Sequence, residues 1–248
     1  MLKTVLVTGA AKRLGRAIAL HLAGAGWNVA IHYHGSAKEA DDVAEAARAL
    51  DVKAATFKAN LSREEETTQL VGRAAAELGP LTALVNSASI FENDDWQSAS
   101  RDSWDAHMET NLRAPFVLSQ AFARQVPQKG AIVNIIDQRV LKPTPQFISY
   151  SLSKAGLHWL TTTLAQALGP NIRVNAIGPG PTMRNARQSE EDFARQRDAT
   201  ILKRGAEPDD VAQAVRYLLE AEAVTGQMLA VDGGQHLIWQ TPDVRVGE

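Results

Sequence analysis

Short apolar runs rich in β-branched residues alternate along the chain with longer stretches of helical spacing. The short runs are nearly continuously apolar, which is typical of strands covered by helices on both faces. Strands are predicted at 4–8, 29–32, 54–58, 83–86, 131–136, 173–177 and 228–231. Helices are predicted at 14–25, 37–50, 63–78, 104–124, 151–168 and 208–221. This alternation predicts an α/β fold, a doubly wound seven-stranded parallel sheet flanked by helices.

No low-complexity linker and no internal repeat divides the sequence, which predicts one domain over residues 1–248. The least regular stretch is 179–205, which begins Pro179-Gly180-Pro181 and continues with polar and charged residues. Two interpretations of this stretch remain open. It is either a lid over a site at the sheet edge, and so a substrate loop, or a plain surface excursion.

Composition narrows the classes of function. The chain has 26 basic and 28 acidic residues, a balance that gives no electrostatic footprint for nucleic acid or an anionic membrane. It has no cysteine, which excludes thiolate nucleophiles and cysteine-based metal sites. The first residues lack the apolar stretch of a signal peptide, and no window approaches the ~20 apolar residues of a membrane span. A cytoplasmic protein acting on a small molecule is expected.

A glycine-rich turn follows the first predicted strand and opens the first helix. Gly9 can adopt the tight turn, and Gly15 permits close packing of helix against strand. Backbone N–H groups at this helix N-terminus can then face a pyrophosphate, as in dinucleotide-binding folds. Since the Gly-x5-Gly spacing departs from the common G-x-G-x-x-G pattern, a simple βα turn remains an alternative.

The end of the second strand indicates the choice of cofactor. NAD-binding folds place an acidic residue here, and this chain has none. Lys12, Arg13, His34 and Ser36 can supply positive charge and hydrogen-bond donors to a 2′-phosphate, so NADP is favoured over NAD. The alternative is that His32 and His34 are surface histidines and Arg13 a solvated helix residue.

Tyr150 and Lys154 start the helix after the fifth strand, and their spacing of four places both side chains on one helical face. A neighbouring ammonium stabilises a phenolate, so Lys154 is expected to lower the pKa of Tyr150. Tyr150 can then exchange a proton with a substrate near neutral pH. An exposed tyrosine beside a solvated lysine is the alternative.

Together these features resemble the short-chain dehydrogenase/reductase family over essentially the whole chain. The matching motifs are Thr8-Gly9-x5-Gly15, Asn86-x-Ala88, Asn111, Tyr150-x3-Lys154, Asn175 with Pro179-Gly180, and Val231-Asp232-Gly233-Gly234. The resemblance implies a Rossmann-type fold, hydride transfer to or from a nicotinamide, and a homotetramer. It makes Tyr150 the proton donor, Lys154 the group that tunes its pKa and binds the nicotinamide ribose, and Asn111 part of a proton relay.

The same resemblance implies a set of cofactor contacts. Asn86 and Ala88 would lie beneath the cofactor, and Pro179-Gly180 would close over the nicotinamide. The full cofactor-binding set is Gly9, Arg13, Leu14, Gly15, His34, Ser36, Asn60, Leu61, Asn86, Ala88, Tyr150, Lys154, Pro179 and Gly180.

Asp137 is the informative departure from that family. It lies thirteen residues before Tyr150, where the family usually has a serine that hydrogen-bonds the substrate carbonyl. A carboxylate there would repel the oxyanion that develops when a ketone is reduced. An acid that carries a proton instead suits reduction of a C=N bond, because nitrogen must receive a proton as carbon takes hydride.

Within the family, Asp137 resembles the pteridine reductases, as do Lys12-Arg13-Leu14-Gly15, His32-Tyr33-His34 and Ala88-Ser89-Ile90-Phe91. This implies NADPH-dependent reduction of a dihydropterin or dihydrofolate, with the oxidised pterin as a further candidate. Phe91 would stack on the pterin opposite the nicotinamide. The implied substrate contacts are Arg13, Ser89, Phe91, Asp137 and Tyr150, with Asp137 and Tyr150 delivering protons. A core aromatic is the alternative for Phe91.

Three positions depart from the pattern: Asn60 replaces an aspartate near the adenine, Ser87 a second asparagine, and Gly35 a basic residue seen in some pteridine reductases. Two other functions stay open. One is a carbonyl reductase acting on a keto acid, a sugar or an acyl thioester, and the other is a non-catalytic NADP-binding sensor. A non-catalytic sensor has no chemical need for a tyrosine with a shifted pKa.

Overall fold

The computed structural model describes residues 3–126, 128–185, 187–241 and 244. At its centre lies one sheet of seven strands in the order β3-β2-β1-β4-β5-β6-β7, in which all neighbouring pairs are parallel. The strands are β1 (Thr4–Val7), β2 (Asn28–Tyr33), β3 (Ala54–Lys58), β4 (Ala83–Asn86), β5 (Gly130–Ile135), β6 (Ile172–Pro179) and β7 (Met228–Val231). The predicted Rossmann-type sheet is confirmed, and every predicted strand is present.

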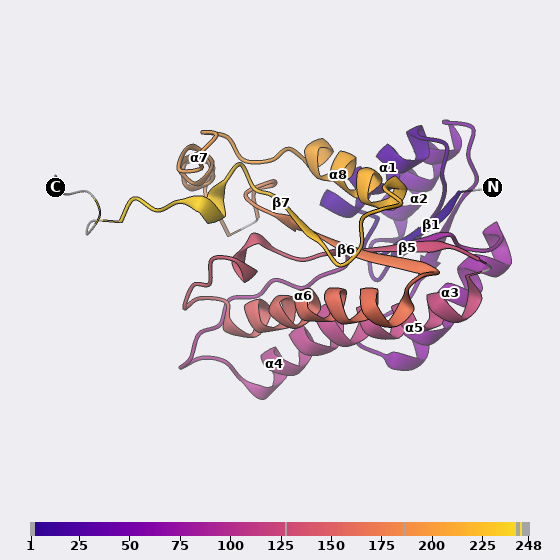
Figure 1. Cartoon of the computed structure of the whole chain (residues 1–248), viewed down its shortest axis with the longest axis horizontal. Helices are drawn as coiled ribbons and strands as arrows, with labels where there is room; N and C mark the ends of the chain where they lie inside the picture. The colour runs from indigo at the N-terminus through magenta and orange to yellow at the C-terminus, as the bar shows by residue number, and fades with distance from the viewer. Residues whose placement is uncertain (1–2, 127, 186, 242–243, 245–248) are drawn as a thin grey trace.

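Helices cover both faces of the sheet (Figure 1). One face carries α1 (Arg13–Gly24), α2 (Ala37–Arg48) and α8 (Pro208–Glu220), and the other carries α3 (Glu64–Leu78), α5 (Ala114–Gln125) and α6 (Ile148–Leu168). The helix α4 (Arg101–Met108) packs beside α6. No helix in the described part of the chain is long and apolar enough to cross a membrane.

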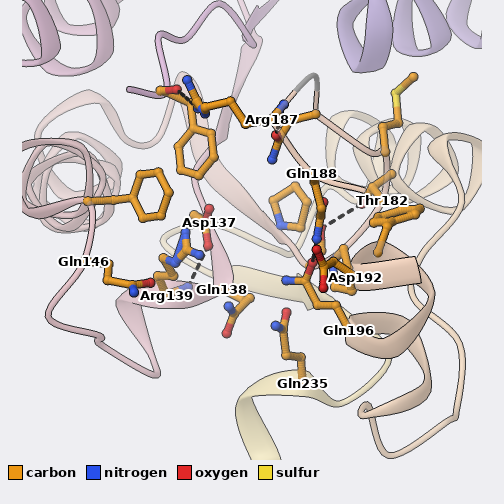
Figure 2. Close-up of a pocket in the computed structure, with 18 of the residues that line it drawn as sticks. Asp137, Gln138, Arg139, Gln146, Thr182, Arg187, Gln188, Asp192, Gln196 and Gln235 are labelled. Atoms are coloured by element: carbon orange, nitrogen blue, oxygen red, sulfur yellow. Dashed lines mark hydrogen bonds between the residues drawn. The ribbon is translucent and has the colours of Figure 1, made fainter. Parts of the chain in front are cut away.

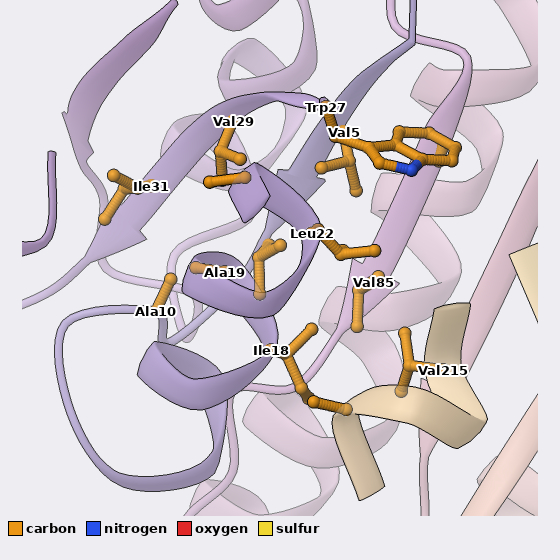
Figure 3. Packing of buried hydrophobic residues seen from close by; sticks show 14 of the residues in the cluster. Val5, Ala10, Ile18, Ala19, Leu22, Trp27, Val29, Ile31, Val85 and Val215 are labelled. Atoms are coloured by element: carbon orange, nitrogen blue, oxygen red, sulfur yellow. The ribbon is translucent and has the colours of Figure 1, made fainter. Parts of the chain in front are cut away.

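Side chains from α1 fill the space between the helix layer and the sheet (Figure 3). Ile18 and Leu22 are fully buried against Val5 of β1 and Val85 of β4. Because β1 and β4 are buried along their whole length, the two strands are held rigidly from both sides. Their carboxyl ends therefore offer a fixed platform for the loops that follow them.

The predicted helix 104–124 is interrupted by a π-helical turn, η1 (Glu109–Arg113), between α4 and α5. Asn111 lies in this turn. A π-turn holds one extra residue per turn and often occurs at functional sites. Hydrophobic spacing does not reveal such an insertion, since the apolar face continues on both sides of it.

The stretch 179–205 is not irregular throughout, because it contains α7 (Glu190–Asp198). Ser189 caps this helix by accepting a hydrogen bond from the Asp192 N–H. Acidic residues in the first turn and arginines in the last complement the helix dipole. α7 buries none of its residues, so it lacks the apolar periodicity on which the helix predictions depended.

A candidate active site at the carboxyl ends of the strands

The first turn after β1 and the loops after β4, β5 and β6 meet around a cavity of about 680 Å³. Successive strands are added to one side of β1 up to β3 and to its other side from β4 onward. The cavity lies at this switch point between β1 and β4, which is the usual ligand position in doubly wound sheets. The predicted cofactor residues that line it are Gly9, Arg13, Leu14, Gly15, His34, Asn60, Leu61, Ala88, Tyr150, Lys154, Pro179 and Gly180.

Two predicted cofactor residues lie outside that lining. Ser36 stands at the N-cap of α2. Asn86 is buried at the end of β4, where its amide donates a hydrogen bond to Asn134 Oδ1 at 2.8 Å. The carbonyl oxygen of the Asn86 side chain is buried without a partner among the described residues. Such an orphaned acceptor needs an explanation, and a bound ligand is one.

Steric contacts explain both glycines of the first turn. Gly9 has φ of +64°, and a Cβ there would lie 2.9 Å from the Cα of Ala88. A Cβ on Gly15 would lie 2.2 Å from the carbonyl oxygen of Gly9. Gly15 therefore allows α1 to pack on the turn itself, a closer approach than the predicted helix–strand packing. Thr8 Oγ1 accepts the N–H groups of Ser87 and Ala88, which joins the turn to the loop after β4.

His32 supports the turn from below. The Gly9 N–H donates to Nδ1 of His32 at 3.0 Å, and the other ring nitrogen, Nε2, lies 3.1 Å from the Ala59 carbonyl oxygen. This pairing requires a neutral ring with its proton on Nε2. Burial lowers the pKa of His32 to about 4. The interpretation of His32 as a surface histidine is wrong, since the ring is buried and holds the backbone of the turn.

The candidate cations for a 2′-phosphate are engaged elsewhere in the protein. Lys12 forms an ion pair with Glu39 at 2.8 Å. The Arg13 guanidinium donates to the carbonyl oxygens of Met183 and Arg184, so Arg13 tethers the stretch 179–205 and is not a freely solvated residue. His34 lines the cavity, and its phosphate contact stays a prediction.

Asp137, Tyr150 and Lys154 come together at the end of β5. The Tyr150 hydroxyl donates to Oδ2 of Asp137 at 2.8 Å, and Nζ of Lys154 donates to the Ile135 carbonyl at 2.9 Å. Tyr150 is 6% exposed and Lys154 is 2% exposed, so the alternative of an exposed tyrosine and a solvated lysine is wrong. Oδ1 of Asp137 accepts the Arg139 N–H at 2.8 Å, which fixes the carboxylate toward Tyr150.

The pKa of Tyr150 departs from the expectation. Burial, and after it the Asp137 carboxylate, raise the pKa of Tyr150 well above 10. Burial lowers the pKa of Lys154 to about 8. The predicted lowering of the Tyr150 pKa is thus wrong in this structure, because the nearest charge to the phenol is a carboxylate and the Lys154 ammonium is bonded to a backbone carbonyl. The phenol is protonated at neutral pH.

Asn111 holds the loop after β4. Its side chain accepts the Ile90 N–H at 2.9 Å and donates to the Ile90 carbonyl at 3.0 Å. It also bonds Ser89 Oγ and Ser153 Oγ, each at 3.1 Å. Asn111 is fully buried and lies outside the cavity lining. Its part in a proton relay stays a prediction, whereas its hydrogen bonds place Ser89 at the cavity wall.

Phe91 is part of an aromatic cluster. Its ring stacks on Phe147 with centroids 4.4 Å apart and meets Tyr150 edge-on at 4.6 Å. Phe91 lines the cavity, so the interpretation as a core aromatic is wrong. Phe147 was not predicted as a site residue. Its only signal in the sequence was an aromatic three positions before Tyr150.

A second cavity, of about 540 Å³, continues from the first past Phe91 and Asp137. Figure 2 shows Asp137, Gln138 and Arg139 on one side of it, facing residues of the stretch 179–205 on the other. That stretch is tied across the opening by Arg187, which pairs with Glu92 at 2.6 Å. The lining residues that were not predicted as site residues include Gln138, Arg139, Gln146, Phe147, Arg187, Gln188, Gln196 and Gln235.

Residues 9–236 match the family model described as Enoyl-(Acyl carrier protein) reductase. Over 244 residues the chain is 32% identical to the 3-oxoacyl-(acyl-carrier-protein) reductase FabG of Staphylococcus epidermidis, a match that covers 96% of this chain and 100% of that protein. The chain belongs to the short-chain dehydrogenase/reductase family of oxidoreductases.

Within that family, two solved structures are more similar still. FolM Alternative dihydrofolate reductase 1 from Brucella suis is 45% identical with a TM-score of 0.94, and the protein of the same name from Brucella canis is 43% identical with a TM-score of 0.92. Each match covers 98% of both chains, and both proteins were crystallised with NADP. These neighbours support the pteridine reductase-like type indicated by the sequence.

Proposed function

We propose that this protein is an NADPH-dependent oxidoreductase that reduces a C=N bond in the ring of a dihydropterin or dihydrofolate. The observation that carries the proposal is the hydrogen bond between the Tyr150 hydroxyl and the Asp137 carboxylate at the end of β5. A carboxylate in this position opposes the negative oxygen of a ketone reduction, whereas a carboxyl–phenol pair can serve a ring nitrogen that must gain a proton.

The residues around the first cavity fit a phosphorylated nicotinamide dinucleotide. The turn from Gly9 to Gly15 opens α1 at the end of β1, where helix N-terminal N–H groups bind phosphate. The residues directly after β2, His34 to Ser36, include no carboxylate that would repel a 2′-phosphate. The unpartnered Asn86 oxygen and the close backbone approach at Gly9 agree with a ligand lying over the end of β4.

When bound, NADPH supplies the hydride that the ring carbon receives. The chain's own residues supply the proton for the neighbouring nitrogen. Because the pKa of Tyr150 is raised, the transferable proton belongs to the Tyr150–Asp137 pair and not to an isolated phenol. Solvent restores that proton after each turnover. The Lys154 ammonium offsets the negative charge left on the pair, and the stretch 179–205 serves as the substrate loop that excludes water.

A carbonyl reductase is the second candidate, because the 32% identical relatives are 3-oxoacyl-(acyl-carrier-protein) reductases. Asp137 argues against this activity. A ketone needs a hydrogen-bond donor at its oxygen, and both oxygens of the Asp137 carboxylate accept hydrogen bonds, one from Tyr150 and one from Arg139.

The test is NADPH oxidation followed at 340 nm with dihydrobiopterin, dihydrofolate and acetoacetyl thioester as substrates. We expect turnover of the pterins and little of the thioester. Asp137→Ser should lower pterin turnover and raise the ratio of thioester to pterin reduction. Oxidation with the thioester alone would make the protein a carbonyl reductase. Binding of NADPH without turnover of any substrate would make it a sensor.

We also propose that the enzyme is a cytoplasmic homotetramer. Two large apolar side chains on α6, Leu152 and Trp159, are exposed, Trp159 to 75%. Leu160 of the same helix lines a groove of about 310 Å³ together with Leu112 and Phe116. Exposed apolar surface on one helix is typical of an interface. Light scattering on the purified protein should give four times the chain mass of 26.8 kDa; the mass of a monomer would contradict the proposal.

A further inference from the structure

Arg139 lines the second cavity, and its guanidinium has no anionic partner among the residues that the structure describes. Its central carbon lies 5.0 Å from the ring centre of Phe147 and 5.6 Å from that of Phe91. Its Nε is buried without a hydrogen-bond partner among the described residues. Arg139 as a whole is only partly exposed, and a guanidinium in such a place is stabilised by an anion more than by contact with aromatic rings alone.

The other charged groups of this cavity are already paired. Arg187, whose guanidinium carbon lies 5.5 Å from the Phe91 ring centre, forms an ion pair with Glu92. The Asp192 carboxylate accepts a hydrogen bond from the Ser189 hydroxyl and is paired with Arg195. Asp137 is engaged by Tyr150 and by the Arg139 N–H. Among the described lining residues, Arg139 is thus the cation whose charge a bound anion can neutralise.

Gln138, next to Arg139 in the chain, also presents an unpartnered polar atom at this cavity. It is 6% exposed, it lines the cavity, and its Oε1 is buried without a partner in the part of the chain that the structure describes. Figure 2 shows Gln138 beside Arg139, with Gln188 and Gln196 across the cavity and Gln235 below them. These amides offer hydrogen bonds without adding charge, so the attraction for an anion at this end of the cavity comes from Arg139.

We propose that Arg139 binds a carboxylate on the tail of the substrate, so that the preferred substrate carries an acidic tail, as dihydrofolate does, and not an uncharged hydroxyalkyl tail. This inference rests on the proposed pterin reduction. Asp137 and Tyr150 mark the reacting ring in the first cavity, and Arg139 lines only the second. A tail that extends from the ring past Phe91 reaches Arg139, whose planar fork matches a carboxylate.

The test compares dihydrofolate with dihydrobiopterin, which share the reacting ring and differ in the tail. In Arg139→Gln the ratio of kcat/KM for dihydrofolate to kcat/KM for dihydrobiopterin should fall about tenfold, mainly through the KM of dihydrofolate, as for loss of a charge-assisted hydrogen bond. Arg139→Lys keeps the charge and should recover part of the ratio. Arg124→Gln removes an exposed arginine at the end of α5 and should leave the ratio unchanged.

Ionic strength gives a further readout, because salt should raise the KM of dihydrofolate in the wild-type protein more than in Arg139→Gln. Equal losses on both substrates in Arg139→Gln would show that Arg139 only supports the aromatic stack, and an unchanged ratio would show that no carboxylate reaches it. Either result overturns the inference while pterin reduction stands. If the wild-type protein reduces neither substrate, the proposed function itself fails.

Discussion

The Tyr150 hydroxyl donates a hydrogen bond to Oδ2 of Asp137 at 2.8 Å, across the gap between the start of α6 and the end of β5. Each partner changes what the other can do. Burial and the Asp137 carboxylate raise the pKa of Tyr150. The Tyr150 hydroxyl in turn occupies Oδ2 of Asp137. In the proposed function the pair acts as one proton-carrying group.

Replacing Tyr150 by phenylalanine removes the hydroxyl and leaves Asp137 without its donor. We expect kcat for dihydropterin reduction to fall by ~10²–10⁴, the usual contribution of a positioned proton donor. NADPH affinity, measured by fluorescence titration, should change little, since the turn between β1 and α1 that would hold the phosphates is unaltered and Tyr150 is only one of the predicted cofactor contacts. Near-normal turnover in Tyr150→Phe would mean that the proton reaches the nitrogen by another route.

The pH profile reports on Lys154, whose pKa burial lowers to about 8. If its ammonium offsets charge on the pair, kcat/KM should decline as the pH rises through about 8. Asp137 counteracts the effect of burial by raising the pKa of Lys154, so Asp137→Asn should move this alkaline limb to lower pH. The measurement is the residual rate of Asp137→Asn against pH. An alkaline limb that stays in place, or moves upward, contradicts the assignment to Lys154.

Local patterns in the sequence were sufficient to predict the sheet and the centre of the site. Apolar runs located all seven strands because a strand buried on both faces has few polar positions. The spacing of Tyr150 and Lys154 placed both on one face of α6, and Gly9 and Gly15 were assigned to the turn that they form. Each of these features is encoded within a few residues, so no long-range contact had to be known.

The remaining features depend on contacts between distant segments. His32 follows no motif, and its function arises because β2 passes beneath Gly9. Arg139 became a site residue only when the fold brought Phe91 and Phe147 beside it. The direction of the Tyr150 pKa shift depended on how fully the phenol is buried and on which charge lies nearest, and sequence spacing gives neither.

The approach of α1 to the first turn predicts opposite effects for two alanine substitutions in the same helix. In Gly15→Ala the new methyl group would lie 2.2 Å from the Gly9 carbonyl oxygen, so the turn must shift. We expect a loss of about 1–3 kcal/mol of unfolding free energy, as for overpacking, and weaker NADPH binding. Gly24→Ala meets nothing within 4 Å and should stabilise the protein by roughly 0.5–1 kcal/mol through helix propensity.

Urea denaturation and cofactor titration of both glycine variants check this prediction. The comparison is internally controlled, because each variant adds one methyl group to α1. If Gly15→Ala bound NADPH as tightly as the wild-type protein, the turn would not be the phosphate site, whatever the change in stability.

Because His32 is buried as a neutral ring, the free energy of unfolding is expected to decrease at acid pH. Its pKa is about 4 in the folded chain against an ordinary value of 6.5, so the unfolded chain binds more protons between these pH values. The neutral ring makes its full contribution to the free energy of unfolding above pH 6.5. This contribution, about 3 kcal/mol in total, is lost as the pH falls toward 4.

The measurement is the free energy of unfolding in urea at several pH values between 7 and 4.5, for the wild-type protein and for His32→Asn. Asparagine is neutral throughout this range and can still accept the Gly9 N–H, so the variant should lose less stability per pH unit whatever its stability at pH 7. Identical slopes for His32→Asn and the wild-type protein would mean that His32 already carries a proton in the fold. A proton on Nδ1 would place two donors against each other at Gly9, and the hydrogen bond at 3.0 Å could not exist.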